Sequence, residues 1–155
     1  MKILDTNLWV FGTLRTNERA TRLLDEIERG ETASAINAYM IQEGLEAFDR
    51  TPGLTGQERD ELKTLFLARM GRMTGLIEAP SSRDVSESLL DERRANVRTR
   101  LLSRVLGIQS KDVPILVLAF EHRDRHPTIL TNDAAFADFD PAEFDLDELA
   151  LEYVD

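Results

Sequence analysis

Apolar residues alternate along the chain between short runs and helical spacing. One helical pattern follows Thr16 and Asn17, either of which would cap a helix, and it ends at Gly30. Its apolar positions are Ala20, Leu23, Leu24 and Ile27. Comparable patterns predict helices over about 37–50, from Thr55 onward, over 82–106 and from about 112. Short apolar runs predict strands over 2–4, 32–36, 74–80 and 127–131.

Turn and capping residues separate these segments. Thr51-Pro52-Gly53 ends the second helix, Thr55 and Glu58 have capping-box spacing, and Gly107 ends the arginine-rich segment. The resulting order is β-α-β-α-α-β-α-α-β. Strands that alternate with helices favour an α/β fold, in which helices cover both faces of a parallel sheet.

Length and composition limit the class of protein. The chain has 155 residues, of which 42% are hydrophobic and 31% are charged, so we expect one domain over 1–155. No apolar run approaches the roughly 18 residues of a membrane span, and the first residues do not resemble a signal peptide. Because the chain has no cysteine, thiolate metal sites and thiol nucleophiles are excluded. We therefore expect a cytoplasmic protein.

The net charge of −10 is unevenly distributed. The C-terminal segment 138–155 has eight acidic residues and no Lys or Arg, so it carries −8, and the remaining chain carries only −2. Of the 19 basic residues, 16 are arginine, the three lysines being Lys2, Lys63 and Lys111. This composition suggests a high-salt cytoplasm, as in a haloarchaeon, because salt screens the repulsion between acidic groups. The alternative is an ordinary acidic protein from a GC-rich genome.

Acidic residues follow or precede several predicted elements. Asp5 ends the first strand, Asp133 follows the last strand by two residues, and Asp112 begins an apolar helix. Glu43 lies near the apolar face of the helix over 37–50. Ligands of parallel α/β sheets bind at the carboxyl ends of the strands, so acids at strand ends are candidate ligands. The sequence leaves open whether Asp112 enters the sheet at that edge.

Each acid also has a structural explanation. Asp112 could simply cap its helix, Asp133 could be a turn residue, and Glu46 could replace Glu43 as the important acid. Asp5 is harder to explain in this way, since an unpaired buried charge is costly. Several carboxylates in one place repel one another unless a hard cation lies among them. The acids therefore predict a site for Mg²⁺ or Mn²⁺.

Four segments resemble, in order and spacing, the acidic motifs of PIN-domain nucleases, especially the VapC-like toxin ribonucleases: "ILDTNLWV", "SAINAYMIQEGLEAF", "KDVPILVLAF" and "ILTNDAAF". The resemblance spans about residues 1–137. It implies that Asp5, Glu43, Asp112 and Asp133 are the catalytic and metal-binding acids. It also implies supporting roles for three polar residues next to them, Thr6, Asn7 and Thr131.

The same resemblance implies a three-layer α/β/α sandwich with a central parallel sheet. The implied activity is Mg²⁺- or Mn²⁺-dependent hydrolysis of RNA, and the implied partners are a small antitoxin protein and a second copy of the chain. Two features depart from the family pattern, Pro114 in the third motif and the acidic C-terminal segment. His122 and His126 lie in a polar connection and are interpreted as solvated rather than catalytic.

An acidic ribonuclease needs a local positive surface, because polyanions bind through clustered basic residues. The arginine-rich segment provides one candidate RNA-binding surface, formed by Arg93, Arg94, Arg98, Arg100 and Arg104. Of these, Arg93, Arg100 and Arg104 would share nearly one helix face. The alternative is that these arginines pair with Glu87, Asp91 and Glu92 on the helix surface.

Two other functions remain open at this stage. A catalytically silent PIN domain could bind RNA or protein as a scaffold, although the presence of all four acids disfavours it. A phosphatase with an aspartyl nucleophile would also have an Asp at the end of its first strand. That class requires a second Asp two residues later, where this chain has Asn7.

The acidic composition generates a prediction about salt. If the composition reflects a saline cytoplasm, screening should stabilise the fold, and the melting temperature should rise as KCl increases from low to molar concentration. RNA binding through arginines should weaken over the same range, because it depends on counterion release. A melting temperature that is constant or falls with KCl would contradict this explanation of the composition.

Overall fold

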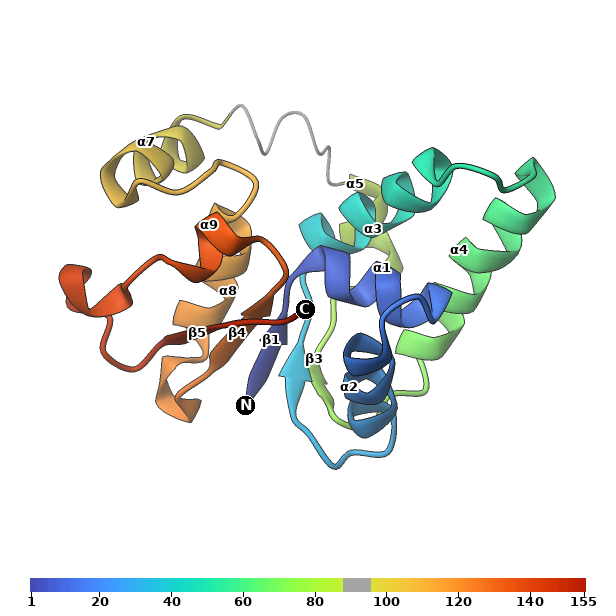
Figure 1. The fold of residues 1–155 in the computed structure, drawn as a ribbon, viewed down its shortest axis with the longest axis horizontal. Coiled ribbons are helices and arrows are strands. Elements are labelled where there is room, and N and C mark those ends of the chain that lie inside the picture. Colours follow the sequence, from blue (N-terminus) through green and yellow to red (C-terminus); the bar gives the residue numbers. More distant parts are fainter. Residues whose placement is uncertain (88–95) are drawn as a thin grey trace.

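The computed structural model describes residues 1–87 and 96–155 (Figure 1). In chain order the elements are β1 (Lys2–Leu4), α1 (Thr6–Leu14), α2 (Glu18–Glu28), β2 (Ser34–Ala35), α3 (Ala38–Arg50), α4 (Gly56–Met70), β3 (Leu76–Glu78), α5 (Ser82–Glu87), α7 (Val97–Leu106), α8 (Val113–Glu121), η1 (Arg123–Arg125), β4 (Thr128–Thr131), α9 (Ala134–Ala137), η2 (Pro141–Phe144) and β5 (Ala150–Tyr153).

The strands form a parallel sheet in two adjoining parts. β1, β4 and β5 pair in that order, with Leu4 opposite Leu130 and Thr131 opposite Tyr153. β2 and β3 form the second part, also in parallel. It adjoins β1, where the backbone N–H of Lys2 donates to the carbonyl of Ala33 at 2.9 Å. The order β3-β2-β1-β4-β5 places β1, with Asp5 at its end, in the centre.

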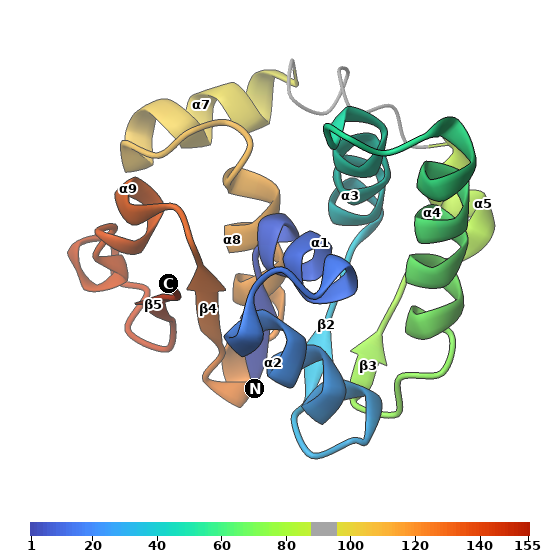
Figure 2. The ribbon, with the colours of Figure 1, turned by 45° about the vertical axis from the view of Figure 1, so that its right-hand side comes forward.

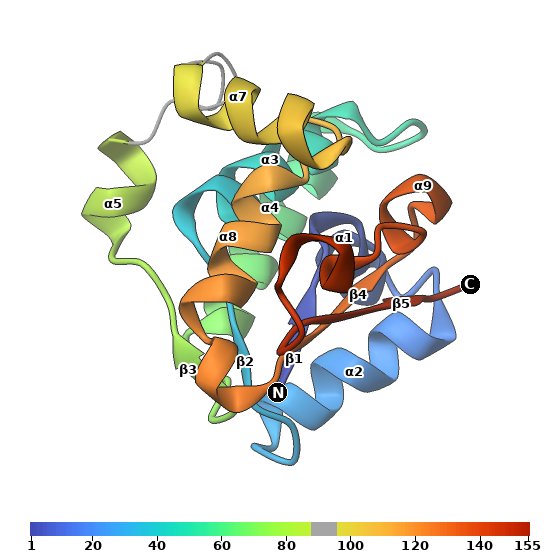
Figure 3. The same cartoon turned by 90° about the vertical axis from the view of Figure 1, so that its left-hand side faces the viewer.

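Helices cover both faces of this sheet, as expected for an α/β fold. In the side view, α8 lies on one side of β1 and β4, and α2 lies on the other (Figure 3). Ile3, Leu4, Ile129 and Leu130 of the central strands are at most 1% exposed. A strand that is buried on both faces must be almost wholly apolar, and this explains the continuous apolar runs in the sequence. The predicted fold class is confirmed.

Five elements were not predicted from the sequence, namely α1, η1, α9, η2 and β5, and two of them bear on the site and the sheet. α1 begins directly after Asp5, so the polar residues Thr6 and Asn7 form the first turn of a helix. β5 lies within the acidic C-terminal segment, where its backbone pairs with β4 while the side chains of Ala150, Glu152 and Tyr153 remain exposed. The segment is therefore part of the sheet, and its acids are solvent-facing residues of an edge strand and its approach.

The arginine-rich segment also differs from the prediction of one helix over 82–106. The structure has α5 at its start and α7 at its end, and residues 88–95 lie outside the described chain. Figure 2 shows α7 above α8 and apart from α5. No helix in the described part of the chain is long and apolar enough to cross a membrane.

Close packing at Gly75 generates a prediction about stability. Its N–H donates to the carbonyl of Ile27 at 2.8 Å, and a Cβ there would lie 2.3 Å from the carbonyl oxygen of Thr32. Because that neighbour is backbone, Gly75→Ala should lower the unfolding free energy by about 1–3 kcal/mol or more in urea denaturation. Gly56→Ala is the control, since no atom lies within 4 Å of its Cβ position. Equal stability of both variants would contradict the packing described here.

Candidate functional site

Asp5 ends the central strand and its carboxylate is buried. The parallel pairing of β1 with β4 continues through the N–H of Asp5, which donates to the carbonyl of Leu130 at 2.8 Å. Its side chain does not cap α1, and the residue is only 5% exposed. The hydroxyl of Thr131 donates to Asp5 Oδ2 at 2.6 Å. Sheet register therefore supplies the hydrogen bond that partly offsets the burial of this carboxylate.

Thr131 also connects Asp5 to the acid that follows β4. Its hydroxyl oxygen accepts the N–H of Asp133 at 3.0 Å. Asp133 Oδ1 caps α9 by accepting the N–H groups of Ala135 and Phe136 at 3.0 and 3.3 Å. Its other oxygen, Oδ2, accepts a charged hydrogen bond from Lys111 Nζ at 2.8 Å. Asp133 is thus both a helix cap and a member of the acidic cluster.

Asp112 lies at the same edge of the sheet and answers the question that the sequence left open. It immediately precedes α8, and its Oδ1 lies 3.9 Å from Lys111 Nζ. The residue is 2% exposed, and its side chain makes no capping hydrogen bond. Capping therefore does not account for this acid. Pro114 lies in the first turn of α8, where proline is tolerated, so the helix that follows is unbroken.

Glu43 approaches the cluster from α3. Tyr39 Oη donates to Glu43 Oε1 at 3.4 Å, and the charge of Glu43 acts on both Asp5 and Asp112. Glu46, the alternative from the sequence, is exposed and lies 3.6 Å from Arg50. Glu43, rather than Glu46, is therefore the acid of α3 whose charge interacts with Asp5 and Asp112.

The electrostatics of the cluster follow from burial and like charge. Burial raises the pKa of Asp5, and Glu43 raises it further, although the Thr131 hydrogen bond opposes the rise. Burial is also the main cause that raises the pKa of Asp112 to about 7, with added repulsion from Asp5 and Asp133. The hydrogen bond from Lys111 instead holds the pKa of Asp133 below its usual value. A cation near Asp5 and Asp112 would relieve this unfavourable field.

Lys111 is the residue of the site that sequence reasoning missed. Burial alone would lower the pKa of its ammonium, but the hydrogen bond to Asp133 and the charges of Asp112 and Asp5 raise it. The available signal was its position directly before Asp112 in a chain with three lysines. Lys111 contributes the positive charge next to the acids.

Thr6 and Asn7 lie beside Asp5 in different environments. Thr6 is 2% exposed, and its hydroxyl has no hydrogen-bond partner among residues 1–87 and 96–155. The Asn7 amide is exposed and donates to the Asn132 side-chain oxygen at 3.0 Å. Thr6 therefore has a buried hydroxyl without a partner in the described chain. Asn7 links the first turn of α1 to the residues that follow β4.

The donor set suits a hard divalent cation, because carboxylate and hydroxyl oxygens are the ligands that Mg²⁺ and Mn²⁺ prefer. The positions of these side chains fit a bound ion less well than their chemistry does. In the described ranges, no three Asp, Glu or His residues are already grouped closely enough to hold one ion. Lys111 Nζ lies within 3.9 Å of the carboxylates of both Asp112 and Asp133, so a cation held by these two acids would be close to a second positive charge.

The two histidines lie outside this cluster. His122 follows α8 at the end opposite Asp112, and its Nε2 lies 2.8 Å from Glu78 Oε2. It is half-buried, so the expectation that it is solvated is wrong, whereas His126 is exposed. The amino end of α8 carries Asp112 and the carboxyl end carries His122, and the helix itself separates them.

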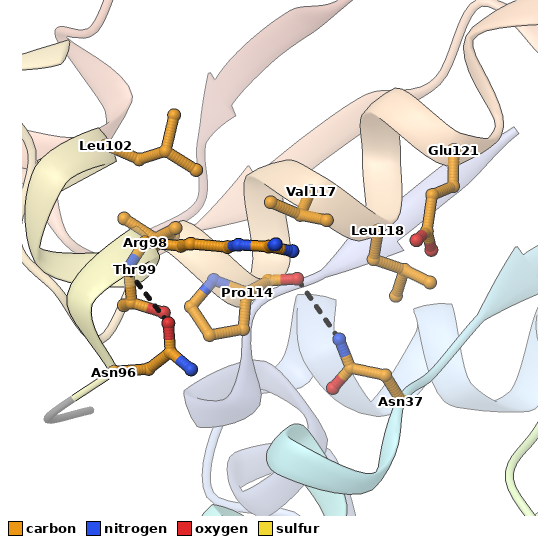
Figure 4. Close-up of a pocket in the computed structure, with 10 residues that line it drawn as sticks. Asn37, Asn96, Arg98, Thr99, Leu102, Pro114, Val117, Leu118 and Glu121 are labelled. Atoms are coloured by element: carbon orange, nitrogen blue, oxygen red, sulfur yellow. Dashed lines mark hydrogen bonds between the residues drawn. The ribbon is translucent and has the colours of Figure 1, made fainter. Parts of the chain in front are cut away.

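The candidate RNA-binding arginines are described in part. Arg98, Arg100 and Arg104 are exposed on α7, and Arg93 and Arg94 lie outside the described residues, as do Asp91 and Glu92. Within the described ranges, no ion pair involves Arg98, Arg100 or Arg104. Arg98 extends along a surface cavity of about 510 Å³ between α7 and α8 (Figure 4).

Comparisons with known proteins identify the fold. No family model and no curated protein sequence matches the chain. Solved structures do match, among them VapBC2 from Rickettsia felis bound to a DNA fragment from their promoter, with a TM-score of 0.54 and 19% identity over 99% of this chain and 98% of that one. FitAcB from Neisseria gonorrhoeae matches with a TM-score of 0.51 and 21% identity, over 97% of this chain and 96% of that one.

The fold is PIN-like. At these identities the likeness concerns the fold alone. Both matches span nearly the whole chain, so the acidic C-terminal segment lies inside the aligned region rather than beyond it. The PIN-like fold of this chain therefore extends past residue 137, where the sequence resemblance ended.

The raised pKa of Asp112 generates a prediction about pH. A carboxyl whose pKa rises from 3.8 to about 7 binds its proton more tightly in the folded state. Its contribution to stability is therefore present at low pH and is lost as the pH rises from about 4 through 7. In EDTA, Asp112→Asn should reduce this loss by about 1–4 kcal/mol, as measured by urea denaturation from about pH 4 to about pH 7.5.

The control for this measurement is Asp124→Asn, which neutralises an exposed acid in η1 and should leave the pH dependence of the native chain in place. If Asp112→Asn and the native chain lose the same stability over this pH range, the raised pKa of Asp112 is not the cause of the pH dependence.

Proposed function

We propose that this chain is a metal-dependent ribonuclease that hydrolyses RNA phosphodiester bonds in the cytoplasm, and that it is the toxin of a toxin–antitoxin pair. The proposal is carried by the electrostatic coupling of four acids, in which the charges of Asp5, Asp133 and Glu43 all act on Asp112, and Asp5 and Asp133 follow neighbouring strands at one edge of the parallel sheet. The burial of Asp5 and Asp112, and the repulsion that Asp112 receives from the other three acids, would be offset by a divalent cation in the site. The PIN-like fold and the four sequence motifs support the same function.

The proposed metal ligands are Asp5, Asp112 and Asp133, with Glu43 acting directly or through water. Mg²⁺ or Mn²⁺ bound there would lower the pKa of a bound water and stabilise negative charge on the attacked phosphate and the leaving oxygen. The chain itself holds the ligands in place: Thr131 orients Asp5, and the cap of α9 fixes one oxygen of Asp133. The chain has no cysteine to act as a nucleophile, and this mechanism requires no side-chain nucleophile.

RNA is the proposed substrate, and α7 is the proposed contact surface. Arg100 and Arg104 line a shallow groove of about 250 Å³ together with Val97 and Leu101. α7 packs next to α8, whose first turn follows Asp112. Arginines without ion pairs in the described chain are suited to phosphate groups, which the guanidinium binds through two parallel hydrogen bonds. The alternative role of pairing with Glu87, Asp91 and Glu92 involves side chains outside the described set.

The same helix is suited to protein partners. Val97, Leu101 and Val105 are 78%, 60% and 61% exposed, and they recur at i, i+4 and i+8 on one face. An apolar stripe beside exposed arginines matches an amphipathic acidic segment, the chemistry expected of a small antitoxin that blocks a nuclease site. A second copy of the chain is the other proposed partner, by the resemblance to VapC-like proteins.

Two alternative functions make different predictions. A silent PIN scaffold would bind RNA or protein without cleavage. A phosphatase with an aspartyl nucleophile would form a phosphoaspartate at Asp5. The position two residues later is occupied by Asn7, whose amide donates to Asn132, so a second catalytic acid is absent there.

The decisive experiment compares the native chain with Asp5→Asn on total RNA, with Mg²⁺ or Mn²⁺ in high salt. The substitution should reduce cleavage about a hundredfold or more, because it removes a ligand oxygen and a charge. Without metal, the variant should melt at the same temperature or higher, since it relieves repulsion. The additional stability that Mn²⁺ confers should decrease, because a ligand stabilises in proportion to its binding of the folded state.

Asp147→Asn is the matched control, since it neutralises an exposed acid in the C-terminal segment. It should retain cleavage and the response to Mn²⁺. A structural role for Asp5 predicts the opposite pattern of lower stability, normal cleavage and an unchanged metal response. Normal RNA cleavage by Asp5→Asn would refute the nuclease proposal.

A further inference from the structure

Lys111 occupies an unusual position for a basic residue. Its ammonium donates to Asp133 Oδ2 at 2.8 Å and lies 3.9 Å from Asp112 Oδ1, so one positive charge serves two of the proposed metal ligands. Its field also reaches Asp5. A divalent ion held by Asp112 and Asp133 would compete with the Lys111 ammonium for these two carboxylates.

The chemistry and exposure of the Lys111 side chain are consistent with competition between its ammonium and a metal ion. The chain uses arginine at 16 of its 19 basic positions but has lysine here. A lysine ammonium is a compact point charge on a flexible stem, whereas the guanidinium is a planar group that binds carboxylates through two parallel hydrogen bonds. The Lys111 side chain is also 36% exposed, so its stem can turn towards solvent without crossing the core.

We infer that Lys111 is an internal cation that neutralises the acidic cluster without metal, and that a divalent ion must displace it in order to bind. The inference rests on the proposed metal site and describes its regulation. Without metal, Lys111 offsets the repulsion among the acids and stabilises the fold. In the presence of metal, the same ammonium competes for Asp133, so the site releases its ion more readily than the four acids alone would.

The test measures Mn²⁺ binding by calorimetry in the full chain. Lys111→Gln removes the charge and keeps a polar side chain, so Mn²⁺ should bind about twofold to fivefold more tightly, the range expected for loss of a partly exposed ion pair. The metal-free variant should melt at a lower temperature, because its acids lose their neutralising partner. These two changes have opposite signs, whereas general damage to the fold would weaken metal binding and stability together.

Two further variants control for charge and shape. Lys111→Arg retains the charge, so it should bind Mn²⁺ no more tightly than the native chain. Lys63→Gln is the matched control on α4, because Lys63 Nζ also contacts two carboxylates, Asp49 at 2.8 Å and Asp60 at 3.1 Å. It should leave Mn²⁺ affinity unchanged, because its carboxylates are not proposed ligands.

The possible results separate this inference from the proposed function. Tighter binding in Lys111→Gln alone supports the competition, as does binding by Lys111→Gln when the native chain binds no Mn²⁺. Equal or weaker binding in Lys111→Gln, or equally tight binding in Lys111→Arg, overturns the inference while RNA cleavage by the native chain still supports the nuclease. If neither the native chain nor Lys111→Gln binds Mn²⁺ and no RNA is cleaved, both proposals fail.

Discussion

The hydrogen bond from Thr131 to Asp5 joins the fold of this chain to its chemistry. It exists because β1 and β4 pair in parallel with Leu4 opposite Leu130, so that the residues that end both strands lie side by side. The pairing is secured by apolar residues with almost no exposed surface, whereas the carboxylate at its end is costly to bury. The other charged residues of the site raise or lower the electrostatic cost of burying that acid.

Electrostatic interactions divide the acids of the site into those whose pKa is lowered and those whose pKa is raised. Asp133 is served by the Lys111 ammonium and by two N–H groups of α9, and its pKa is lowered. The Lys111 ammonium lies farther from Asp112, at 3.9 Å, and burial raises the pKa of this carboxyl to about 7. The charged forms of Asp5 and Asp112 are therefore the ones that the site disfavours, and a divalent cation would remove this imbalance. The same imbalance connects the stability of this chain to pH and, in the proposed function, to metal binding.

The fold could be predicted from the sequence wherever burial imposes a period. Leu23, Leu24 and Ile27 mark α2 because one helix face must be apolar, and Ile129 and Leu130 mark a strand that is buried on both faces. The missed elements lack these signals. α1 is apolar nearly all round, so it has no amphipathic period, and β5 presents mostly exposed side chains to solvent. Its pairing with β4 is a backbone interaction, which leaves little trace in side-chain pattern.

The sequence by itself determined which acids terminate or begin the predicted elements, because a carboxylate after a buried strand is visible in the order of residues. It did not determine that Asp112 enters at the same edge as Asp5, since the hand and path of the connections are properties of the whole chain. The residues themselves left Glu43 and Glu46 both open, and only the family resemblance favoured Glu43, because the choice depends on how α3 is rotated against the sheet. Only the tertiary structure placed Lys111 against Asp133, because 22 residues separate them in the chain and their contact depends on the packing of α8 against β4.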